Sequence, residues 1–375
     1  MNTSLQKPLL TFFLMAYNQE RFVRQAVEGA FRQTYSPLEI ILSDDCSKDR
    51  TFEIMREVAQ AYRGPHKVVL NRNPETLGIS AHVNQGMKLS TGALIVVAAG
   101  DDISVPERAE VLQDAWESHG RPSLCSLYSG GSRINASGKT LGILRIIESN
   151  ENLDEVISRC GTNVIGATHA WHRSLFDVFG PLPHGLNSED RLISFRAALN
   201  NRVFCVNREL VAYRKHSGNI SSNRVSDAFL PYKNLIQNET RIFQEQIKYL
   251  GGYLQDLEIL LRNDPAKRER ITAWQEAIKE KIAERENFLR FLCGRFIERR
   301  KLCRAGAMSS ELFLRGPSLR FGGVCPGLAP AHYYLRLATQ YLRGGVIRSV
   351  RAMPLLHRTL KRLRAEETNQ LPSTP

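Results

Sequence analysis

The chain has 375 residues, which is more than a usual single domain, so we expect two structural units. Its apolar share of 42% is ordinary for a soluble globular protein, and it has no run of about 18 apolar residues, so we expect no transmembrane helix. The net charge of +13 is concentrated after Asn287, where the sequence has 16 lysines and arginines and only 4 acidic residues.

The cysteines and the first residues of the chain suggest its compartment. The seven cysteines are scattered, and none of them forms a Cys-x-x-Cys pair, which favours a reducing compartment and argues against a structural zinc. Residues 1–8 have no basic segment followed by a long apolar one, and the apolar run 9–16 is short. We therefore expect a first strand instead of a signal peptide, and a cytoplasmic protein.

The first 120 residues alternate predicted strands and helices, as in a parallel sheet with right-handed crossovers. Apolar runs typical of strands buried on both faces are followed each time by residues at helical spacing. The predicted strands are 9–16, 38–42, 67–70 and 93–100, and the predicted helices are 22–31, a helix from about Thr51, 79–89 and 106–120.

Two of these strands end on pairs of carboxylates, Asp44–Asp45 and Asp101–Asp102. Ligands of such sheets lie beyond the carboxyl ends of the strands, where carboxylates could hold Mg²⁺ or Mn²⁺ against a phosphate. The alternative is structural: Asp101 caps the next helix, Asp102 is solvated and Asp45 is a turn residue. The chain has neither Gly-x-Gly-x-x-Gly after its first strand nor a P-loop motif, which argues against a dinucleotide-binding fold and a P-loop NTPase.

The rest of the chain is less regular and then becomes helical. We expect strands at 124–128, 141–147, 203–206 and 210–213, and helices at 175–180 and 188–200. Apolar residues at helical spacing then predict a helical hairpin, followed by basic helices and a polar end that we expect to be disordered. The predicted division is 1–225 for the α/β domain, 226–298 for the hairpin and 299–375 for the basic amphipathic tail.

A series of short motifs runs through the first 220 residues. In order they are Ala16-Tyr-Asn18, Gln33-Thr-Tyr35, Leu38-Glu-Ile-Ile-Leu-Ser-Asp-Asp-Cys-Ser-Lys-Asp-Arg-Thr51, Asn73, Gly78, Asn84, Thr91-Gly92, Gly100-Asp-Asp102 with Pro106 and Arg108, Ser188-Glu-Asp190 and Tyr213-Arg-Lys-His-Ser-Gly-Asn219. Together, in this order, they resemble the family 2 glycosyltransferases. The resemblance implies an α/β fold of the GT-A type, with a mostly parallel sheet flanked by helices, here followed by a helical extension.

The resemblance also implies a chemistry: inverting transfer of a sugar from a nucleotide-diphosphate sugar, most often UDP-linked, with Mg²⁺ or Mn²⁺. The cation would stabilise charge on the departing diphosphate, and a carboxylate would take the proton of the acceptor hydroxyl. The implied residues are Tyr17, Asp45 and Asp101 for the nucleotide sugar, Asp102 and His216 for the metal, and Asp190 as the catalytic base.

Each assignment has a structural alternative. Asp190 could be an ordinary carboxylate in the first turn of a helix, His216 a surface histidine, and Tyr17 a packed aromatic residue. The commoner family pattern has another aspartate where this chain has Ala99, which leaves fewer metal ligands and keeps open a non-catalytic nucleotide-sugar or glycan-binding protein. The Gln-x-x-Arg-Trp motif of processive members is absent, so we expect one sugar to be added per encounter.

The basic tail has three interpretations: a solvated helical surface, an amphipathic patch on an anionic membrane, or a nucleic-acid-binding segment. The second would place the protein peripherally on the inner face of the plasma membrane, near a glycan or lipid-linked acceptor for cell-surface polysaccharide synthesis. No nucleic-acid motif accompanies the charge, so no specific nucleic acid is expected.

Overall fold

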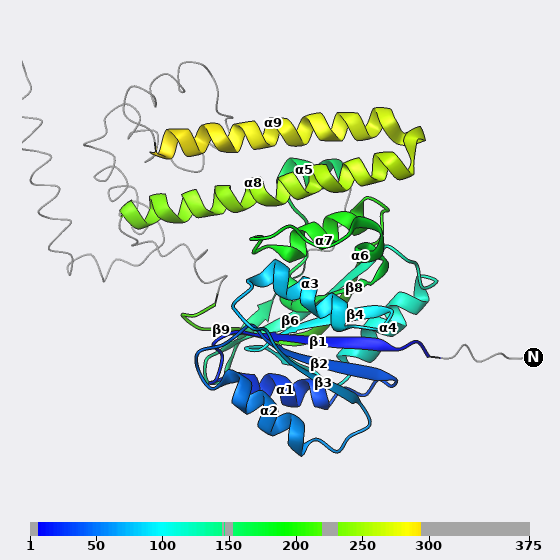
Figure 1. Ribbon diagram of the computed structural model, residues 1–375, viewed down its shortest axis with the longest axis vertical. Helices are drawn as coiled ribbons and strands as arrows, with labels where there is room; N and C mark the ends of the chain where they lie inside the picture. Colours follow the sequence, from blue (N-terminus) through cyan, green and yellow to red (C-terminus); the bar gives the residue numbers. More distant parts are fainter. Residues whose placement is uncertain (1–6, 145, 147–152, 220–231, 294–375) are drawn as a thin grey trace, which may run out of the picture. The chain divides into compact units, whose positions relative to one another are not determined.

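Figure 1 shows the computed structural model, which describes residues 7–144, 146, 153–219 and 232–293. The chain divides into two compact units, one made of Met1–Ser222 with Glu245–Ile282, the other of Asn223–Gln244 with Ala283–Pro375. The first unit ends close to the predicted boundary at residue 225, but it also includes the middle of the predicted hairpin. The predicted basic tail, 299–375, lies outside the described residues.

The first third of the chain alternates strands and helices as predicted, and the element boundaries agree within a few residues. The elements are β1 (Leu10–Ala16), α1 (Val23–Phe31), β2 (Leu38–Asp44), α2 (Thr51–Ala61), β3 (Lys67–Arg72), α3 (Ile79–Leu89), β4 (Leu94–Ala99), β5 (Ile103–Ser104) and α4 (Arg108–Ser118).

The second part contains elements that the sequence did not predict. The two strands expected at 203–206 and 210–213 are one strand, β9, and neither β8 nor α5 was predicted. The elements are β6 (Ser126–Asn135), β7 (Thr140–Leu144), α5 (Leu153–Arg159), the 3₁₀ turn η1 (Gly166–Thr168), β8 (His169–His172), α6 (Ser174–Phe179), α7 (Glu189–Ala198), β9 (Val203–Lys215), α8 (Tyr232–Asn263), η3 (Pro265–Lys267) and α9 (Arg268–Cys293).

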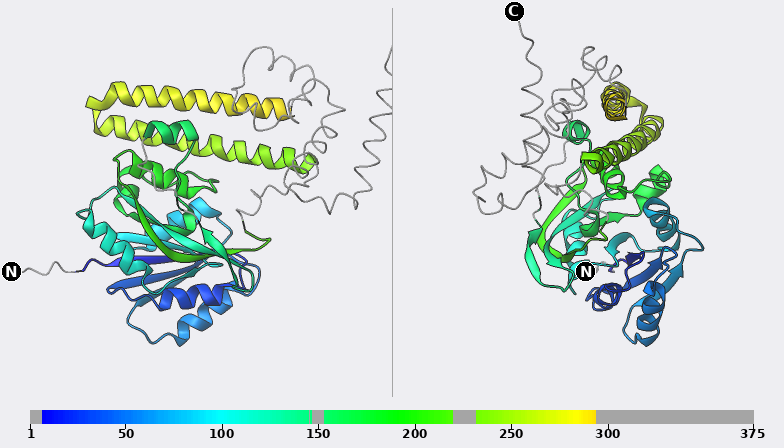
Figure 2. Two further views of the ribbon diagram at one scale, coloured as in Figure 1. Left: turned by 180° about the vertical axis from the view of Figure 1, so that it is seen from behind. Right: turned by 90° about the vertical axis from the view of Figure 1, so that its left-hand side faces the viewer.

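Within the described residues, nine strands form one curled sheet in the order β3-β2-β1-β4-β8-β6-β9-β5, with β7 paired to β6 (Figure 2). Strands β3, β2, β1 and β4 are parallel, which confirms the predicted parallel pairing. Strand β8 runs antiparallel between β4 and β6, so the second half of the sheet is mixed. The predicted α/β class with flanking helices and a helical extension is confirmed.

Alternating side chains of the parallel strands build a core on each face of the sheet. Phe13, Ile41 and Ile95 face a core shared with α3, α5, α6, α7 and parts of α8 and α9. Their neighbours in the strands, such as Phe12 and Ile40, face a second core under α1, α2 and α4. Figure 1 shows α1 and α2 below the sheet and α3, α6 and α7 above it. Both faces are therefore covered, as near-continuous apolar strands require.

Among the helices that the structure describes, none is both long enough and apolar enough to span a bilayer. The longest, α8, has an amphipathic pattern, and its apolar face packs into the first core.

A buried carboxylate fixes the amino-terminal edge of the sheet. Glu39, in β2, accepts hydrogen bonds from the Thr11 hydroxyl (2.6 Å), the Thr91 hydroxyl (2.7 Å) and the Gly92 amide (3.2 Å). Position 92 requires glycine, because a Cβ there would lie 2.4 Å from the Thr11 nitrogen. Burial raises the pKa of Glu39, but these hydrogen bonds outweigh burial and lower it below the ordinary 4.5.

We predict that Glu39→Ala lowers the free energy of unfolding at pH 7 by about 3 kcal/mol or more, because several buried donors lose their acceptor. Since the folded pKa of Glu39 is depressed, its stabilisation is present above about pH 4.5 and is lost as the pH falls through the folded value. Urea unfolding at pH 7 and pH 3 measures the difference, which should shrink in acid.

The control is Glu57→Ala, because Glu57 is half exposed and forms a surface ion pair with Arg24. It should change the free energy of unfolding by less than about 1 kcal/mol. Equal effects of the two substitutions at pH 7 would contradict the role assigned to Glu39.

Candidate active site

The carboxyl ends of β1, β2 and β4 meet at one edge of the sheet. Ala16 pairs with Asp44, and Met15 pairs with Ala99. The loops that leave these strands carry the predicted residues Tyr17, Asp45 and Asp101–Asp102. The sheet therefore brings together three segments that are far apart in the sequence, at the edge where α/β sheets bind ligands.

Asp101 is held by the loop that follows β9. Its Oδ2 accepts a hydrogen bond from Asn219 Nδ2 (3.0 Å) and lies 2.9 Å from Nε2 of His216. The imidazole also packs against the Phe22 ring, with the ring centroids 4.7 Å apart. The structure thus places His216 beside the carboxylate pair, in contact with Asp101. Asn219 was part of the quoted motif, but it was not predicted as a site residue.

Asp102 is buried, and one of its carboxylate oxygens accepts no hydrogen bond from the described residues. Its Oδ1 accepts the Arg214 amide at 2.7 Å, whereas its buried Oδ2 has no hydrogen-bond partner among the described residues. Burial raises the pKa of Asp102 well above its usual range, and the Asp101 carboxylate raises it further. The Arg214 amide and the nearby cations of Arg108 and Arg214 oppose this rise.

The donor set of this pair fits a hard divalent cation. An orphaned carboxylate oxygen beside a second carboxylate is the kind of ligand that Mg²⁺ or Mn²⁺ takes, with substrate phosphates completing the coordination. In the described part of the chain, no group of three or more His, Cys, Asp or Glu side chains could hold a metal ion by itself. The side chains that would hold the cation are Asp101 and Asp102, with His216 adjacent.

Two buried arginines surround the carboxylate pair. Arg214 donates to the Asp101 carbonyl (2.8 Å), to the Ala136 carbonyl (3.1 Å) and to Gln25 Oε1 (2.6 Å). Arg108 is fully buried and donates to Ser104 Oγ and to main-chain carbonyls of β4 and η1. Burial lowers the pKa of Arg108 to about 9, while the Asp102 carboxylate opposes this shift.

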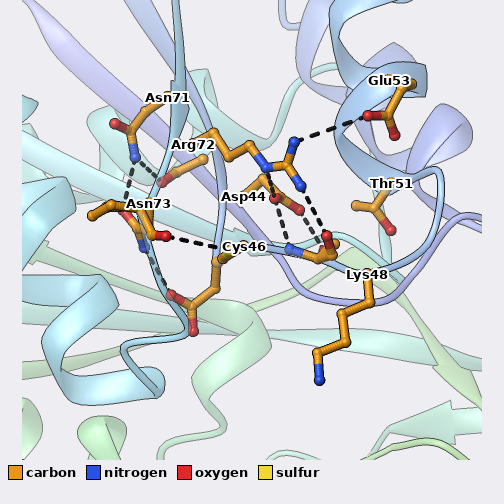
Figure 3. A network of polar contacts seen from close by, with 12 residues as sticks. Asp44, Cys46, Lys48, Thr51, Glu53, Asn71, Arg72 and Asn73 are labelled. Atoms are coloured by element: carbon orange, nitrogen blue, oxygen red, sulfur yellow. Dashed lines mark hydrogen bonds and ion pairs between the residues drawn. The ribbon is translucent and has the colours of Figure 1, made fainter.

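Asp45 lies at the end of a buried hydrogen-bond network. Its Oδ1 accepts Asn73 Nδ2 (2.8 Å) and the Leu77 amide (3.0 Å), and its Oδ2 accepts the Gly78 amide (3.0 Å). Figure 3 shows Asn71 reaching Asn73, and Arg72 pointing the other way toward Asp44. The position and orientation of the Asp45 carboxylate are therefore fixed by its neighbours.

A buried histidine, His82, contacts a serine of this network. The Ser43 hydroxyl lies 2.7 Å from Nε2 of His82 and accepts a hydrogen bond from Asn71. Burial lowers the pKa of His82 to about 4, so the ring is neutral at pH 7, although the Asp45 carboxylate opposes the shift. Tyr17, in contrast, is 43% exposed, so its ring is not the packed core aromatic of the structural alternative.

The predicted base Asp190 begins helix α7 together with Glu189. Asp190 Oδ2 accepts the Gly166 amide at 3.2 Å, and its Oδ1 accepts the Arg191 amide at 2.9 Å. Burial raises the pKa of Glu189 to about 8, the Asp190 carboxylate adds to the rise, and Glu245 contributes less. Glu189 therefore keeps its proton at neutral pH, and the pair does not place two charges side by side.

The turn η1 links the predicted base to the carboxylate pair. Its first residue, Gly166, donates to Asp190, and its second, Ala167, accepts from the Arg108 guanidinium beside Asp102. A Cβ at Gly166 would lie 3.0 Å from Glu189 Oε1, so the turn approaches the acidic pair closely. This turn thus connects Asp190, through hydrogen bonds, to Arg108, whose pKa is affected by the Asp102 carboxylate.

Helix α8 supports α7 from the side away from the sheet. Tyr253 stacks on Phe195, with ring centroids 3.7 Å apart, and Asp256 forms a buried ion pair with Arg196 at 2.9 Å. Glu245 accepts the Asn187 amide in the loop before α7. The sequence predicted a helical hairpin here but not these contacts, because side-chain pairs between distant helices leave no periodic signal.

We predict that Glu189→Gln raises the stability of the folded protein above pH 4.5. The folded pKa of Glu189 is raised, so ionisation favours the unfolded state between about pH 4.5 and pH 8. The glutamine variant should therefore have a higher melting temperature than the parent at pH 8, and nearly the same one at pH 4. A variant that is less stable at pH 8 would show that the Glu189 side chain is ionised and stabilising.

We also predict that Asp256→Ala costs about 3–5 kcal/mol, because it leaves the buried Arg196 charge without a partner. Asp177→Ala, in the exposed pair of Arg173 and Asp177, should cost less than about 1 kcal/mol. Denaturant unfolding of both variants measures these costs, and the ion pair is unimportant if they are equal.

Part of the chain is similar to known proteins. Residues 11–170 match the description "Glycosyl transferase family 2". EpsE of Bacillus subtilis (strain 168), named as a glycosyltransferase, is 32% identical over 112 residues, which are 30% of this chain and 40% of EpsE. Chondroitin synthase of Escherichia coli is 28% identical over 134 residues, 36% of this chain and 19% of that protein. The chain thus spans less than half the length of these two relatives.

Two solved structures are also similar in part. TarS 1–349 of S. aureus, in complex with UDP-GlcNAc, has a TM-score of 0.47 and 16% identity, covering 89% of this chain and 92% of TarS. The mannosyltransferase PcManGT of Pyrobaculum calidifontis, in complex with GDP-Man and Mn²⁺, has a TM-score of 0.46 and 15% identity, covering 91% and 89%.

Proposed function

Since residues 11–170 match glycosyltransferase family 2, we propose that the protein is a metal-dependent, inverting glycosyltransferase. It would move one sugar per encounter from a nucleotide-diphosphate sugar, UDP-linked by preference, to a glycan or lipid-linked acceptor in cell-surface polysaccharide synthesis. The supporting observation is the linkage of Asp102, with its orphaned oxygen, to Asp190 through Arg108 and the turn η1.

The donor would bind along the edge formed by β1, β2 and β4. Tyr17 offers an exposed ring for stacking on the base, and Asp45 offers a fixed carboxylate that can accept a base N–H. Asp101 and Asp102 would hold Mg²⁺ or Mn²⁺, which supplies positive charge for the diphosphate leaving group. Burial raises the pKa of Asp102, so a bound cation would take the place of the proton that burial favours there.

The acceptor would bind at the amino-terminal end of α7. The Asp190 carboxylate is oriented there by the Gly166 and Arg191 amides and would take the proton of the acceptor hydroxyl. The neutral Glu189 beside it can donate a hydrogen bond. Attack from the side opposite the diphosphate would invert the anomeric carbon without a covalent intermediate.

The location of the protein and its acceptor remain predictions. The basic helices expected to bind an anionic membrane on the inner face lie in 299–375, outside the described residues. The same holds for the two other interpretations of that tail.

We predict that Asp190→Asn and Asp102→Asn separate catalysis from binding. The first should lower kcat by roughly 10²–10⁴-fold and leave metal-dependent donor binding unchanged. The second should abolish the stabilisation that a nucleotide sugar gives in the presence of Mn²⁺. A thermal-shift screen of nucleotide sugars with Mn²⁺ or chelator identifies the donor, since a ligand at a hundredfold excess over Kd stabilises by about 2.7 kcal/mol.

Asp177→Asn is the control, because this exposed carboxylate on α6 lies outside the proposed site. If wild type and Asp102→Asn hydrolyse the donor at the same rate, the enzyme proposal is wrong. Metal-dependent donor binding without any turnover would instead favour the non-catalytic nucleotide-sugar-binding protein that Ala99 leaves open.

A further inference from the structure

The hairpin of β6 and β7 presents apolar side chains to solvent. Leu141 is 54% exposed and Ile143 is 60% exposed, more than any other large hydrophobic residue of the described chain. They flank Gly142 on β7, whose register with β6 shifts between Arg133 and Ile134, while Leu144 packs near Gly131. In the described residues β7 pairs only with β6, which makes it an edge strand.

Most of the charges around this hairpin are positive. Arg133 and Lys139 lie on the hairpin, and Lys215 pairs with Asn135 from the neighbouring strand β9. The Arg133 guanidinium lies next to Gly142, its partner residue across the hairpin. The stretches 126–144 and 210–219 contain no aspartate or glutamate, and the exposed Glu209 of β9 pairs with Gly130 of β6. The surface therefore combines two apolar side chains with more cations than anions.

The hairpin is also preorganised. The Asn135 side-chain oxygen accepts the Ser137 amide (3.0 Å), the Ser137 hydroxyl (2.8 Å) and the Lys139 amide (2.9 Å). Arg214 holds the same turn through the carbonyls of Asn135 and Ala136. A surface that is already ordered loses little conformational entropy when it binds.

We propose that the β6–β7 hairpin docks on an anionic lipid surface, with Leu141 and Ile143 inserted at the interface and the cations beside the headgroups. Apolar side chains flanked by lysine and arginine are the composition that binds such interfaces. A second copy of the chain fits less well, because pairing two β7 edges would bring like charges together. Docking of the hairpin does not depend on the proposed glycosyl transfer.

Docking of the hairpin would also position the candidate active site, because Arg214 connects the hairpin turn to Asp101 and Asp102. Its guanidinium contacts Ala136 and the Asp101 carbonyl, and its amide binds Asp102. A hairpin seated on a bilayer would therefore hold this edge of the sheet close to the headgroups. If the proposed function is also correct, the acceptor on that side is carried by a lipid.

A tryptophan substitution on β7 of the full-length chain, Ile143→Trp, tests the contact directly. The native Trp116, Trp171 and Trp274 are all buried, so the emission of the new indole can be separated from theirs. On vesicles of phosphatidylcholine and phosphatidylglycerol, we expect a blue shift and quenching by brominated acyl chains, and neither on phosphatidylcholine alone. The matched control is Val178→Trp, an exposed apolar position on α6 that should show neither effect.

Two results would overturn the proposal. One is an Ile143→Trp variant whose added emission does not respond to vesicles, even if the full chain sediments with them, because another part of the chain then binds. The other is an added emission that is already blue-shifted without lipid, because the chain or a second copy then covers the hairpin.

The double variant Leu141→Ser and Ile143→Ser gives a second measure. Losing both apolar side chains should weaken partitioning into the anionic vesicles roughly tenfold or more. Both positions are exposed, so the variant should keep the parent's melting temperature, which checks that it folds. Unchanged partitioning of a folded double variant contradicts the proposal. Donor binding in solution should stay the same, which keeps this result separate from a failure of the proposed function.

Discussion

The edge of the sheet depends on burying two adjacent carboxylates, Asp101 and Asp102, at the end of β4. Buried charges are costly unless cations and hydrogen bonds compensate them. Here the compensation comes from Arg108 and Arg214, which are themselves buried and need further acceptors. Those acceptors are carbonyls of β4, η1 and the β6–β7 turn. One electrostatic requirement thus ties together the segments that form the candidate site.

The acidic pair of α7 is positioned by a different part of the chain. This helix packs on Tyr253 and Asp256 of α8 through Phe195 and Arg196. Residues 245–282 accordingly belong to the same compact unit as the α/β domain. The helical extension therefore stabilises the candidate base, although the family match ends at residue 170.

Sequence reasoning succeeded where a periodic signal exists. The strands from β1 to β4 are apolar runs broken by turn residues, and their carboxylates could be assigned to one edge because parallel strands end together. Sequence reasoning failed for β8, because four residues are too few to show a period. It also divided β9 into two predicted strands, at the place where the register of β9 with β6 is irregular, residues 206–211. Some contacts join residues about 60 to 190 positions apart in the sequence, as those of Arg108, Arg214 and α8 do. No local sequence pattern predicts contacts of this kind.

The position of Ala99 bears on how a cation would be held. The commoner family pattern has an aspartate there, and this chain has a methyl group. Asp101 is engaged by His216 and Asn219, which leaves the orphaned Asp102 oxygen as the readiest ligand. Under the proposed function, the diphosphate would then supply much of the coordination, so the cation and the donor would each raise the other's affinity by the same factor. A site of this kind takes up its metal together with its substrate.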